Sequence, residues 1–311
     1  MITFFADGSD IISIDAFERA NSCDVVVGIT FKKSESDLID YRKTSHVGRN
    51  NLNGRGLKNQ FYYFNIYSSI NSTNRFDLSQ IAQDCQNSFE LGDYVPTHLT
   101  HARLQLNGRI ENFWLLSGSD CRVHIFQEDL KQQCFTSIKI DVFPEFRFLK
   151  HKSLHVTTMN IEFYPSGDVS RRVTAVGCED GFLKFFVIDH KEGHKPEVIS
   201  TYEYQFDGPI FSASFFTDSN AQQNCWFDKI TLQQKRNRSC TNVHLFVGTS
   251  SETPVVFRDI LERGVSHKLP LTGALDRTDI ILASLICDTT LDGFNDIVIG
   301  KYSKVNFTSF I

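Results

Sequence analysis

Short apolar runs that end in glycine recur along the chain, each flanked by strands in which apolar and polar residues alternate. The five glycines are Gly28, Gly118, Gly177, Gly248 and Gly300. Alternation predicts a strand with one buried face, whereas a continuous apolar run predicts a strand buried on both faces. We expect each glycine to supply a tight turn, or to allow close backbone approach, where the buried strand ends.

The flanking strands turn these runs into a repeated unit of at least three strands. Alternating strands before the runs are expected at 11–17, 101–106, 156–164, 210–216 and 280–287, and strands after them at 61–67, 122–127, 182–189, 254–260 and 304–310. Small antiparallel sheets must stack to bury their faces, and the β-propeller is the common solution for four-stranded units. The sequence therefore predicts an all-β, β-propeller-like fold, as a single domain over residues 1–311.

Polar insertions and one helix account for the uneven length of the repeats. The insertions are expected at 32–60 and 217–242. A short helix is expected at 76–87, where Asp77 and Gln80 fit a capping pair. Its apolar face would consist of Leu78, Ile81, Ala82 and Cys85. The helix is either a covering element between blades or a segment packed into the core.

The composition supports a large core and argues against nucleic-acid binding. The chain has 311 residues, is 41% hydrophobic and contains 28 Phe, which is enough apolar surface for a globular fold. Its formal net charge of −5 is the opposite of what a protein that binds phosphate backbones needs.

The cysteines and the N-terminus favour an intracellular location. The eight cysteines form no CxxC pair and no zinc-finger spacing, so we expect reduced, mostly buried thiols. The start MITFFADGSD lacks the basic region and the longer apolar run of a signal peptide, and no 18-residue apolar run occurs, so no transmembrane segment is expected.

One aspartate-rich stretch, CDTTLDGFNDIVIG at 287–300, approaches the pattern of a calcium loop. It places Asp288, Asp292 and Asp296 around Gly293, just before a buried strand. Propellers of the integrin-α type carry calcium loops with acidic residues at alternate positions ahead of such a strand. These three aspartates are therefore the candidate metal ligands.

Two positions weaken the calcium interpretation. Thr290 occupies a position where a carboxylate is expected, and the twelfth position of an EF-hand reading is Ile299 instead of glutamate. The loop either binds calcium weakly or forms a metal-free turn. We expect the turn, with the aspartates bonded to backbone N–H groups and Gly293 at positive φ, and we expect no cofactor.

Catalytic motifs are missing from the sequence. It contains no GxSxG, GxxxxGK[ST], GxGxxG or HExxH pattern, so we assign no catalytic or cofactor-binding residue and expect no enzymatic activity. His98 and His101 could form a metal pair, but we expect ordinary strand histidines with hydrogen bonds.

A basic segment at 41–60 is the strongest candidate for partner contact. It has no acidic residue, and its basic residues are Arg42, Lys43, Arg49, Arg55 and Lys58. Such a segment could meet actin, anionic lipid or an acidic partner, or it could be a solvated insertion. A second basic group lies in the other insertion and consists of Lys235, Arg236 and Arg238.

Several stretches in register resemble the kaptin family, whose members are subunits of the KICSTOR complex. The stretches are DIISIDAF (10–17), VVVGITF (25–31), FDLSQIAQDC (76–85), LLSGSD (115–120), SRRVTAVGCEDGFLK (170–184), DGPI (207–210), PVVFRDILERG (254–264) and LDGFNDIVIG (291–300). They occur in the family's order and span nearly the whole chain.

The resemblance implies a non-enzymatic, seven-bladed propeller protein related to the FG-GAP and integrin-α propellers. It implies an FG-GAP-repeat partner, the other KICSTOR subunits and a GATOR-type complex as partners, a cytoplasmic location at the lysosomal surface, and restraint of the TOR kinase when amino acids or glucose are scarce. The family is also linked to actin filaments in lamellipodia and stereocilia. A propeller hydrolase or a lectin-like binder is the alternative of a different class.

The sequence departs from the family at one insertion and at both ends. The segment 34–60 is longer and more polar than the family's connection, and family members extend beyond both ends of the matched region. We therefore expect an incomplete chain with about five of the repeats. Open sheet faces and unpaired edges would then need to be covered by a partner.

Overall fold

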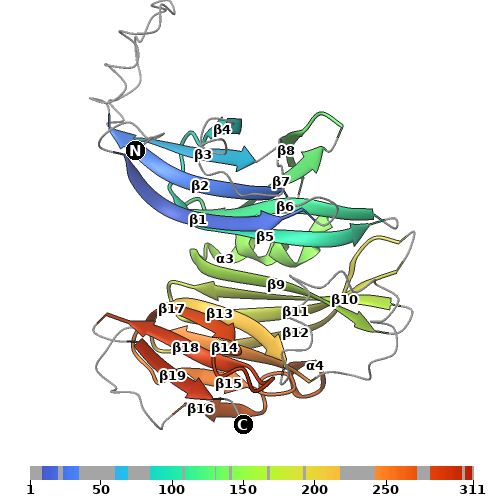
Figure 1. Ribbon diagram of the computed structural model, residues 1–311, viewed down its shortest axis with the longest axis vertical. Helices are drawn as coiled ribbons and strands as arrows, with labels where there is room; N and C mark the ends of the chain where they lie inside the picture. The colour runs from blue at the N-terminus through green and yellow to red at the C-terminus, as the bar shows by residue number, and fades with distance from the viewer. Residues whose placement is uncertain are drawn as a thin grey trace, which may run out of the picture. The chain divides into compact units, whose positions relative to one another are not determined.

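The computed structural model consists of antiparallel sheets joined by turns, as the ribbon in Figure 1 shows. Strands dominate, which confirms the predicted all-β, propeller-like class. The structure describes residues 9–19, 24–34, 60–68, 85–106, 109–129, 131–139, 142–166, 169–191, 194–217, 242–271, 281–302 and 305–309. Within these ranges no helix has both the length and the apolar character needed to cross a membrane.

Backbone contacts divide the chain into two compact units. The first comprises residues 1–105 and 109–139, and the second comprises residues 106–108 and 140–311. The single domain over residues 1–311 that the sequence suggests stays a prediction.

The first unit holds two four-stranded sheets, in each of which the strands pair in chain order. The first strands of the two sheets, β1 and β5, lie side by side (Figure 1). Leu99 N on β5 donates to Ser13 Oγ on β1 over 3.1 Å, and His101 N on β5 donates to Asp15 Oδ2 on β1 over 2.7 Å. The strands are β1 (Asp10–Glu18), β2 (Val25–Ser34), β3 (Gln60–Ser68) and β4 (Cys85–Glu90) in one sheet, and β5 (Pro96–Leu106), β6 (Arg109–Gly118), β7 (Val123–Asp129) and β8 (Cys134–Ile138) in the other.

Aromatic side chains fill the space between these two sheets. Trp114 on β6 is fully buried, and its ring centroid lies 5.2 Å from that of Phe17 on β1 and 6.1 Å from that of Phe64 on β3. Phe64 in turn lies 5.1 Å from Phe126 on β7. These rings remove large apolar areas from water, which is the dominant favourable term for such a layer.

The second unit holds two four-stranded sheets and one three-stranded sheet, again paired in chain order. Their strands are β9 (Val156–Ser166), β10 (Val169–Cys178), β11 (Phe182–His190) and β12 (Glu197–Gln205); then β13 (Ile210–Thr217), β14 (Val243–Thr249), β15 (Val255–Phe257) and β16 (Lys268–Pro270); and finally β17 (Ile281–Cys287), β18 (Asp296–Lys301) and β19 (Val305–Ser309).

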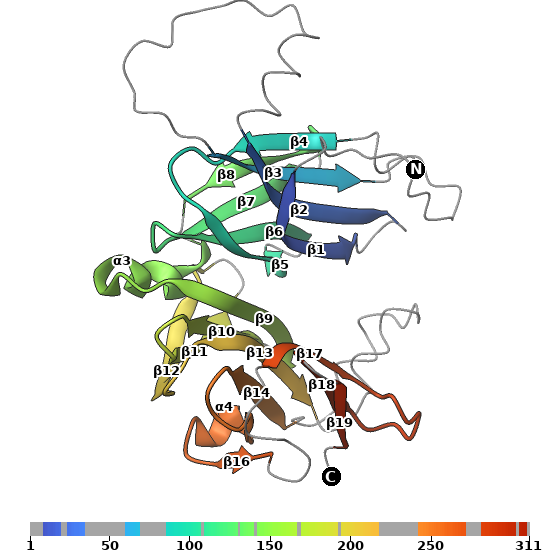
Figure 2. The ribbon, with the colours of Figure 1, turned by 90° about the vertical axis from the view of Figure 1, so that its left-hand side faces the viewer.

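The first strands of these three sheets are neighbours, with β13 between β9 and β17 (Figure 2). Thr157 Oγ1 on β9 donates to the carbonyl oxygen of Ile210 on β13 over 2.5 Å. The hydroxyl groups of Ser212 on β13 and Ser284 on β17 lie 2.5 Å apart. First strands that meet along one line, with the later strands of each sheet farther out, are the arrangement of propeller blades.

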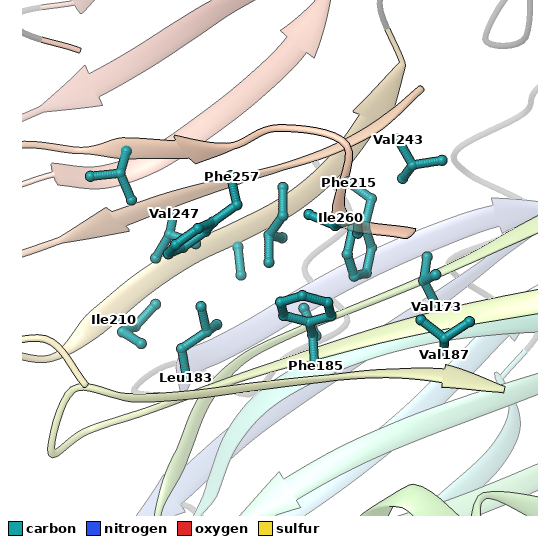
Figure 3. Close-up of a cluster of buried hydrophobic side chains, with 14 of the residues drawn as sticks. Val173, Leu183, Phe185, Val187, Ile210, Phe215, Val243, Val247, Phe257 and Ile260 are labelled. Atoms are coloured by element: carbon teal, nitrogen blue, oxygen red, sulfur yellow. The ribbon is translucent and has the colours of Figure 1, made fainter. Parts of the chain in front are cut away.

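An aliphatic and aromatic core joins the first two sheets of this unit. Figure 3 shows Leu183, Phe185 and Val187 from β11 facing Phe215 from β13 and Phe257 from β15. Every residue of β14 is buried, which is what a continuous apolar run between two packed sheets requires.

The helix predicted at 76–87 is wrong where the structure describes it. Cys85 and the two residues after it belong to β4, which pairs with β3, and 76–84 lie outside the described residues. The ring of Phe89 on β4 stacks on that of Phe64 on β3, with 5.9 Å between their centroids. Pairing as a strand therefore places Phe89 against the core. Helices occur elsewhere in the described chain: the 3-10 helix η2 (Pro144–Phe148), α3 (Leu149–Lys152) and α4 (Ile260–Arg263).

Candidate functional site

Three of the repeat glycines lie inside strands and mark points of close packing between sheets. A Cβ atom on Gly177 would lie 2.7 Å from Ile210 Cγ2, and one on Gly248 would lie 3.0 Å from Ile281 Cγ2. On Gly28 it would lie 3.0 Å from both Leu99 and Trp114. Real Cβ atoms almost never come as close as at Gly177, and at Gly28 and Gly248 the neighbouring side chains would have to shift by a few tenths of an ångström, so glycine eases the approach of the next sheet. The close-approach interpretation therefore fits these positions.

A turn does not explain these three glycines. Gly28 and Gly177 pair with residues on both neighbouring strands, and Gly248 pairs with a residue on β13. None of the three has a positive φ. Gly118 does border a turn, since its N–H donates to the carbonyl of Arg122 and its carbonyl accepts from Cys121 N. Of the two options expected from the sequence, close approach thus fits Gly28, Gly177 and Gly248, and a turn borders Gly118.

Gly300 differs from the other four repeat glycines. It lies in β18, and the nearest atoms to a Cβ placed there are Ala283 O at 3.6 Å and Ala283 Cβ at 3.9 Å, both within its own sheet. No described side chain from another sheet fills this notch. We define the Gly300 notch as the space over Gly300 between Ala283 on β17 and Val305 on β19, the residues paired with it.

The aspartates of the candidate calcium loop bond to the backbone of the loop itself. Asp288 Oδ1 accepts from Asp292 N over 3.1 Å, and Asp288 Oδ2 accepts from Gly293 N over 2.9 Å. Asp292 Oδ1 accepts from Phe294 N over 2.9 Å. Gly293 has a φ of 90°, which is open to glycine and strained for other residues.

Asp296, the third candidate ligand, faces a different part of the loop. Its Oδ2 accepts from Thr289 N over 3.0 Å and from Thr290 N over 3.2 Å, and the Thr289 hydroxyl also donates to it. Asp296 is buried, so these donors replace the water that its carboxylate would otherwise bind.

Together these bonds describe a turn held by carboxylates. Calcium takes six to eight oxygen ligands around one centre. Asp288 and Asp296 instead accept from backbone groups in separate parts of the loop, and the part of the chain that the structure describes contains no group of three His, Cys, Asp or Glu side chains suited to a metal ion. The hydrogen bonds resemble those of the turn expected from the sequence, and calcium binding by this loop stays a prediction.

The two histidines considered as a metal pair do not face one another. His98 and His101 are three residues apart on β5, and side chains alternate along a strand, so an odd separation places them on opposite faces. His101 Nδ1 lies 2.8 Å from Asp15 Oδ2, and its ring lies 5.3 Å from that of Phe17. His101 thus helps to join the first two sheets.

The basic residues proposed for partner contact lie outside the described residues. This holds for Arg42, Lys43, Arg49, Arg55 and Lys58, and for the second group, Lys235, Arg236 and Arg238. Both insertions, 32–60 and 217–242, are described only at their ends, where residues 32–34, 60, 217 and 242 lie.

Sequence reasoning missed a buried polar network between the sheets of the first unit. Arg19 Nε lies 2.7 Å from Glu128 Oε1, and Arg19 Nη1 donates to Ser68 Oγ over 2.7 Å. Asn112 Nδ2 donates to the second carboxylate oxygen of Glu128 over 2.6 Å. Arg19 and Glu128 are 109 residues apart, so no local pattern signals the pair.

A second missed pair lies in the other unit, where η2 meets β10. Arg172 Nη2 donates to Glu145 Oε2 over 2.9 Å, and Thr174 Oγ1 donates to Glu145 Oε1 over 3.0 Å. Both charged side chains are fully buried, and the guanidinium lies 4.6 Å from the Phe143 ring centroid. Burial lowers the pKa of Arg172, and the Glu145 charge opposes that shift. Arg172 alternates with the polar residues Ser170 and Thr174 along β10, and this pattern does not indicate a buried partner.

Comparison with known proteins adds the family. The family described as KICSTOR complex protein kaptin matches residues 1–306. The mouse protein named KICSTOR complex protein kaptin is 28% identical over 298 residues, which cover 95% of this chain and 60% of the mouse protein. The chain thus spans about 60% of the length of this curated relative. Because the family match covers nearly the entire chain, the chain belongs to the kaptin family.

Proposed function

We propose that this chain is a non-catalytic scaffold subunit of a KICSTOR-like complex. The proposed complex acts at the lysosomal membrane and restrains TOR kinase signalling when amino acids or glucose are scarce. The observation that carries the proposal is the family match over residues 1–306. Its proposed partners are an FG-GAP-repeat subunit, the remaining KICSTOR subunits and a GATOR-type complex.

The chemistry of the described residues supports docking rather than turnover. The charged groups that lie between elements are engaged with one another, as Arg19 is with Glu128 and Arg172 is with Glu145. The aspartates of the loop at 288–296 hold backbone groups of that loop. Such groups stabilise a rigid surface, and rigid propeller surfaces carry the function of many scaffold proteins.

Affinity purification tests this proposal. The chain, tagged at one end and expressed in cells, is crosslinked and purified, and its partners are identified by mass spectrometry. We expect an FG-GAP-repeat partner and further KICSTOR subunits, in amounts that survive a high-salt wash. Recovery of actin without any of these subunits would contradict the proposal.

A second candidate function is direct binding to actin filaments, favoured by the basic segment at 41–60. Actin is acidic, so five basic residues without an acidic neighbour supply complementary charge. The chain would then sediment with filaments, less so as salt rises. Replacing Arg42, Lys43, Arg49, Arg55 and Lys58 with Gln should abolish sedimentation, whereas replacing Lys235, Arg236 and Arg238 with Gln should not. Equal losses in both variants would indicate nonspecific charge attraction.

A further inference from the structure

Arg172 carries buried hydrogen-bond donors that no described residue accepts. Its Nη2 donates to Glu145 Oε2 over 2.9 Å and to the carbonyl oxygen of Val142 over 3.2 Å. Its Nε and Nη1 atoms are buried and have no hydrogen-bond partner among the residues that the structure describes. A guanidinium has five N–H donors and no acceptor, so with two donors used, three remain without a partner.

His190 adds another unpartnered nitrogen on the same face of the sheet. Arg172 pairs with Ile188, and His190 lies two residues farther along β11, so alternation places Arg172 and His190 on one face. Such diagonal neighbours lie about 7–8 Å apart, within reach of long side chains. His190 is 9% exposed, and its Nε2 is buried without a hydrogen-bond partner in the described part of the chain.

The described groups around these nitrogen atoms are aromatic or already hydrogen-bonded. The Phe143 ring centroid lies 4.6 Å from Arg172 Cζ, and the Phe163 ring centroid lies 5.1 Å from that of His190. The Thr174 hydroxyl donates to Glu145 Oε1 over 3.0 Å. A buried donor without an acceptor is unfavourable, so a ligand that supplies acceptors here would stabilise the fold.

This shortage of acceptors determines the chemical class of the ligand. A water molecule can accept two hydrogen bonds, but it brings two donors that need acceptors of their own, so the shortage remains. A small anion accepts several hydrogen bonds and donates none. The adjacent Nε–H and Nη1–H groups of a guanidinium form the kind of fork that binds anionic oxygens.

We propose that a small monovalent anion, such as chloride or formate, binds to Arg172 Nε and Nη1, with His190 Nε2 as a further donor. The charges of Arg172 and Glu145 cancel, so the anion adds a negative charge that a proton on His190 balances. The anion and the proton therefore bind together, and the affinity for the anion increases as the pH falls. This anion site is separate from the proposed role in a KICSTOR-like complex.

The charges near His190 explain the link to protonation. Burial, and then the charge of Arg172, lowers the pKa of His190 to about 4. Farther along the same face of β11, Lys184 is paired with Glu203 of β12 over 2.6 Å, and Lys152 of α3 lies 3.7 Å from the same carboxylate. An anion beside His190 would offset the charge of Arg172 and should raise the pKa of His190.

An NMR titration of the histidine rings provides the first test. The chain, labelled with ¹³C at histidine Cε1, is titrated in sodium chloride and, at equal ionic strength, in sodium gluconate, whose anion is too large for a buried site. The signal that is missing from His190→Phe identifies His190. Its pKa should be higher in chloride by about one unit or more, while the other histidines should titrate alike in both salts. Equal pKa values of His190 in the two salts would overturn the proposal.

Urea denaturation at about pH 5 provides the second test. Chloride should raise the free energy of unfolding relative to gluconate, increasingly so with concentration, because the anion binds only the folded state. The double variant Glu145→Leu with Arg172→Met removes both buried charges and should abolish this difference. Arg171→Gln is the matched control, because Arg171 lies on the opposite face and bonds to Asp189, and it should retain the difference. An equal chloride effect in all three proteins would indicate a general salt effect and refute the anion site.

Discussion

Single atoms decide how closely neighbouring sheets can pack, as Gly177 in β10 shows. Gly177 has no positive φ, so backbone freedom does not explain it. Its role is to leave room, because a Cβ would lie 2.7 Å from both Ile210 Cγ2 and Thr158 Cγ2. These two atoms come from different strands and cannot both move away without opening the sheet junction.

Gly177→Ala should therefore destabilise the protein by about 1–3 kcal/mol through overpacking. The matched control is Gly300→Ala, since the nearest atoms there lie 3.6 Å and 3.9 Å away. That change should be neutral or slightly stabilising, because alanine reduces the freedom of the unfolded chain. Urea denaturation measures both free energies of unfolding. Equal losses at the two positions would show that a general intolerance of Cβ, rather than packing, explains the glycines.

His190 makes the stability of the fold dependent on pH. Burial, helped by the nearby charge of Arg172, lowers the pKa of His190 to about 4. In the unfolded chain the pKa of histidine is about 6.5. Between these pH values the unfolded state binds a proton that the folded state does not. The contribution of His190 to the free energy of unfolding is therefore complete above pH 6.5 and is lost as the pH falls toward 4.

The contribution of His190 can be isolated by His190→Phe, which removes the titrating group and keeps a ring near Phe163. Between pH 7 and pH 4, the free energy of unfolding of the original protein should fall by roughly 3 kcal/mol more than that of the variant. Free energies of unfolding from urea titrations at each pH measure the difference. Parallel pH profiles for the two proteins would place the acid sensitivity elsewhere.

Only part of this residue chemistry could be predicted from the sequence. Residues that act within a few positions of one another leave a pattern, and the loop at 288–296 behaves as its aspartates and Gly293 suggest. Close approach at Gly177 was one of two options that the pattern left open. The buried partners of Arg19 and Arg172 lie 109 and 27 residues away, and pairs at such separations produce no periodic signal.

At the level of elements, a buried ion pair ties η2 to the middle of a sheet. Glu145 is the acidic residue in the first turn of η2, and Arg172 lies on β10. Both side chains have no exposed surface. A buried pair of this kind gains little over apolar residues, but loss of one partner leaves an uncompensated charge in a medium that solvates it poorly.

Glu145→Gln should consequently reduce the free energy of unfolding by about 3–5 kcal/mol. The double variant Glu145→Leu with Arg172→Met should lose much less, because neither charge remains buried. Chemical denaturation of the two variants gives the comparison. A double variant that is less stable than Glu145→Gln alone would show that the attraction between Glu145 and Arg172 exceeds the free-energy cost of removing both charges from water.

The first three strands of each sheet could be predicted from the sequence pattern. Strands such as β10, β11 and β14 are buried on both faces or alternate strictly, so their composition reveals them. In the four-stranded sheets the fourth strand has only one strand neighbour, and it is short in β8 and β16, at five and three residues. A short edge strand needs few apolar residues, and its register comes from the neighbouring strand rather than from its own pattern.

At the scale of the whole molecule, the repeat in the sequence predicted the number of sheets because each sheet contributes one glycine-marked strand. The five glycines lie in β2, β6, β10, β14 and β18, one in each of the five sheets that the described residues form. What the repeat cannot specify is cooperativity, since that depends on contacts between sheets rather than on the pattern within each. The single domain over residues 1–311 is therefore a question for unfolding experiments.

A fluorescence experiment addresses that question. Trp114 is fully buried in the first unit, and the chain has one other tryptophan, Trp226. In a Trp226→Phe background, Trp114 reports on the first unit alone, whereas Gly177→Ala weakens a junction in the second. If the chain is one domain, unfolding is all-or-none. The free energy of unfolding reported by Trp114 should then fall by the same amount as that of the whole protein. Gly28→Ala, which crowds Trp114 and Leu99 directly, is the positive control for the probe. A Trp114 midpoint that responds to Gly28→Ala but not to Gly177→Ala would mean that the two units unfold independently.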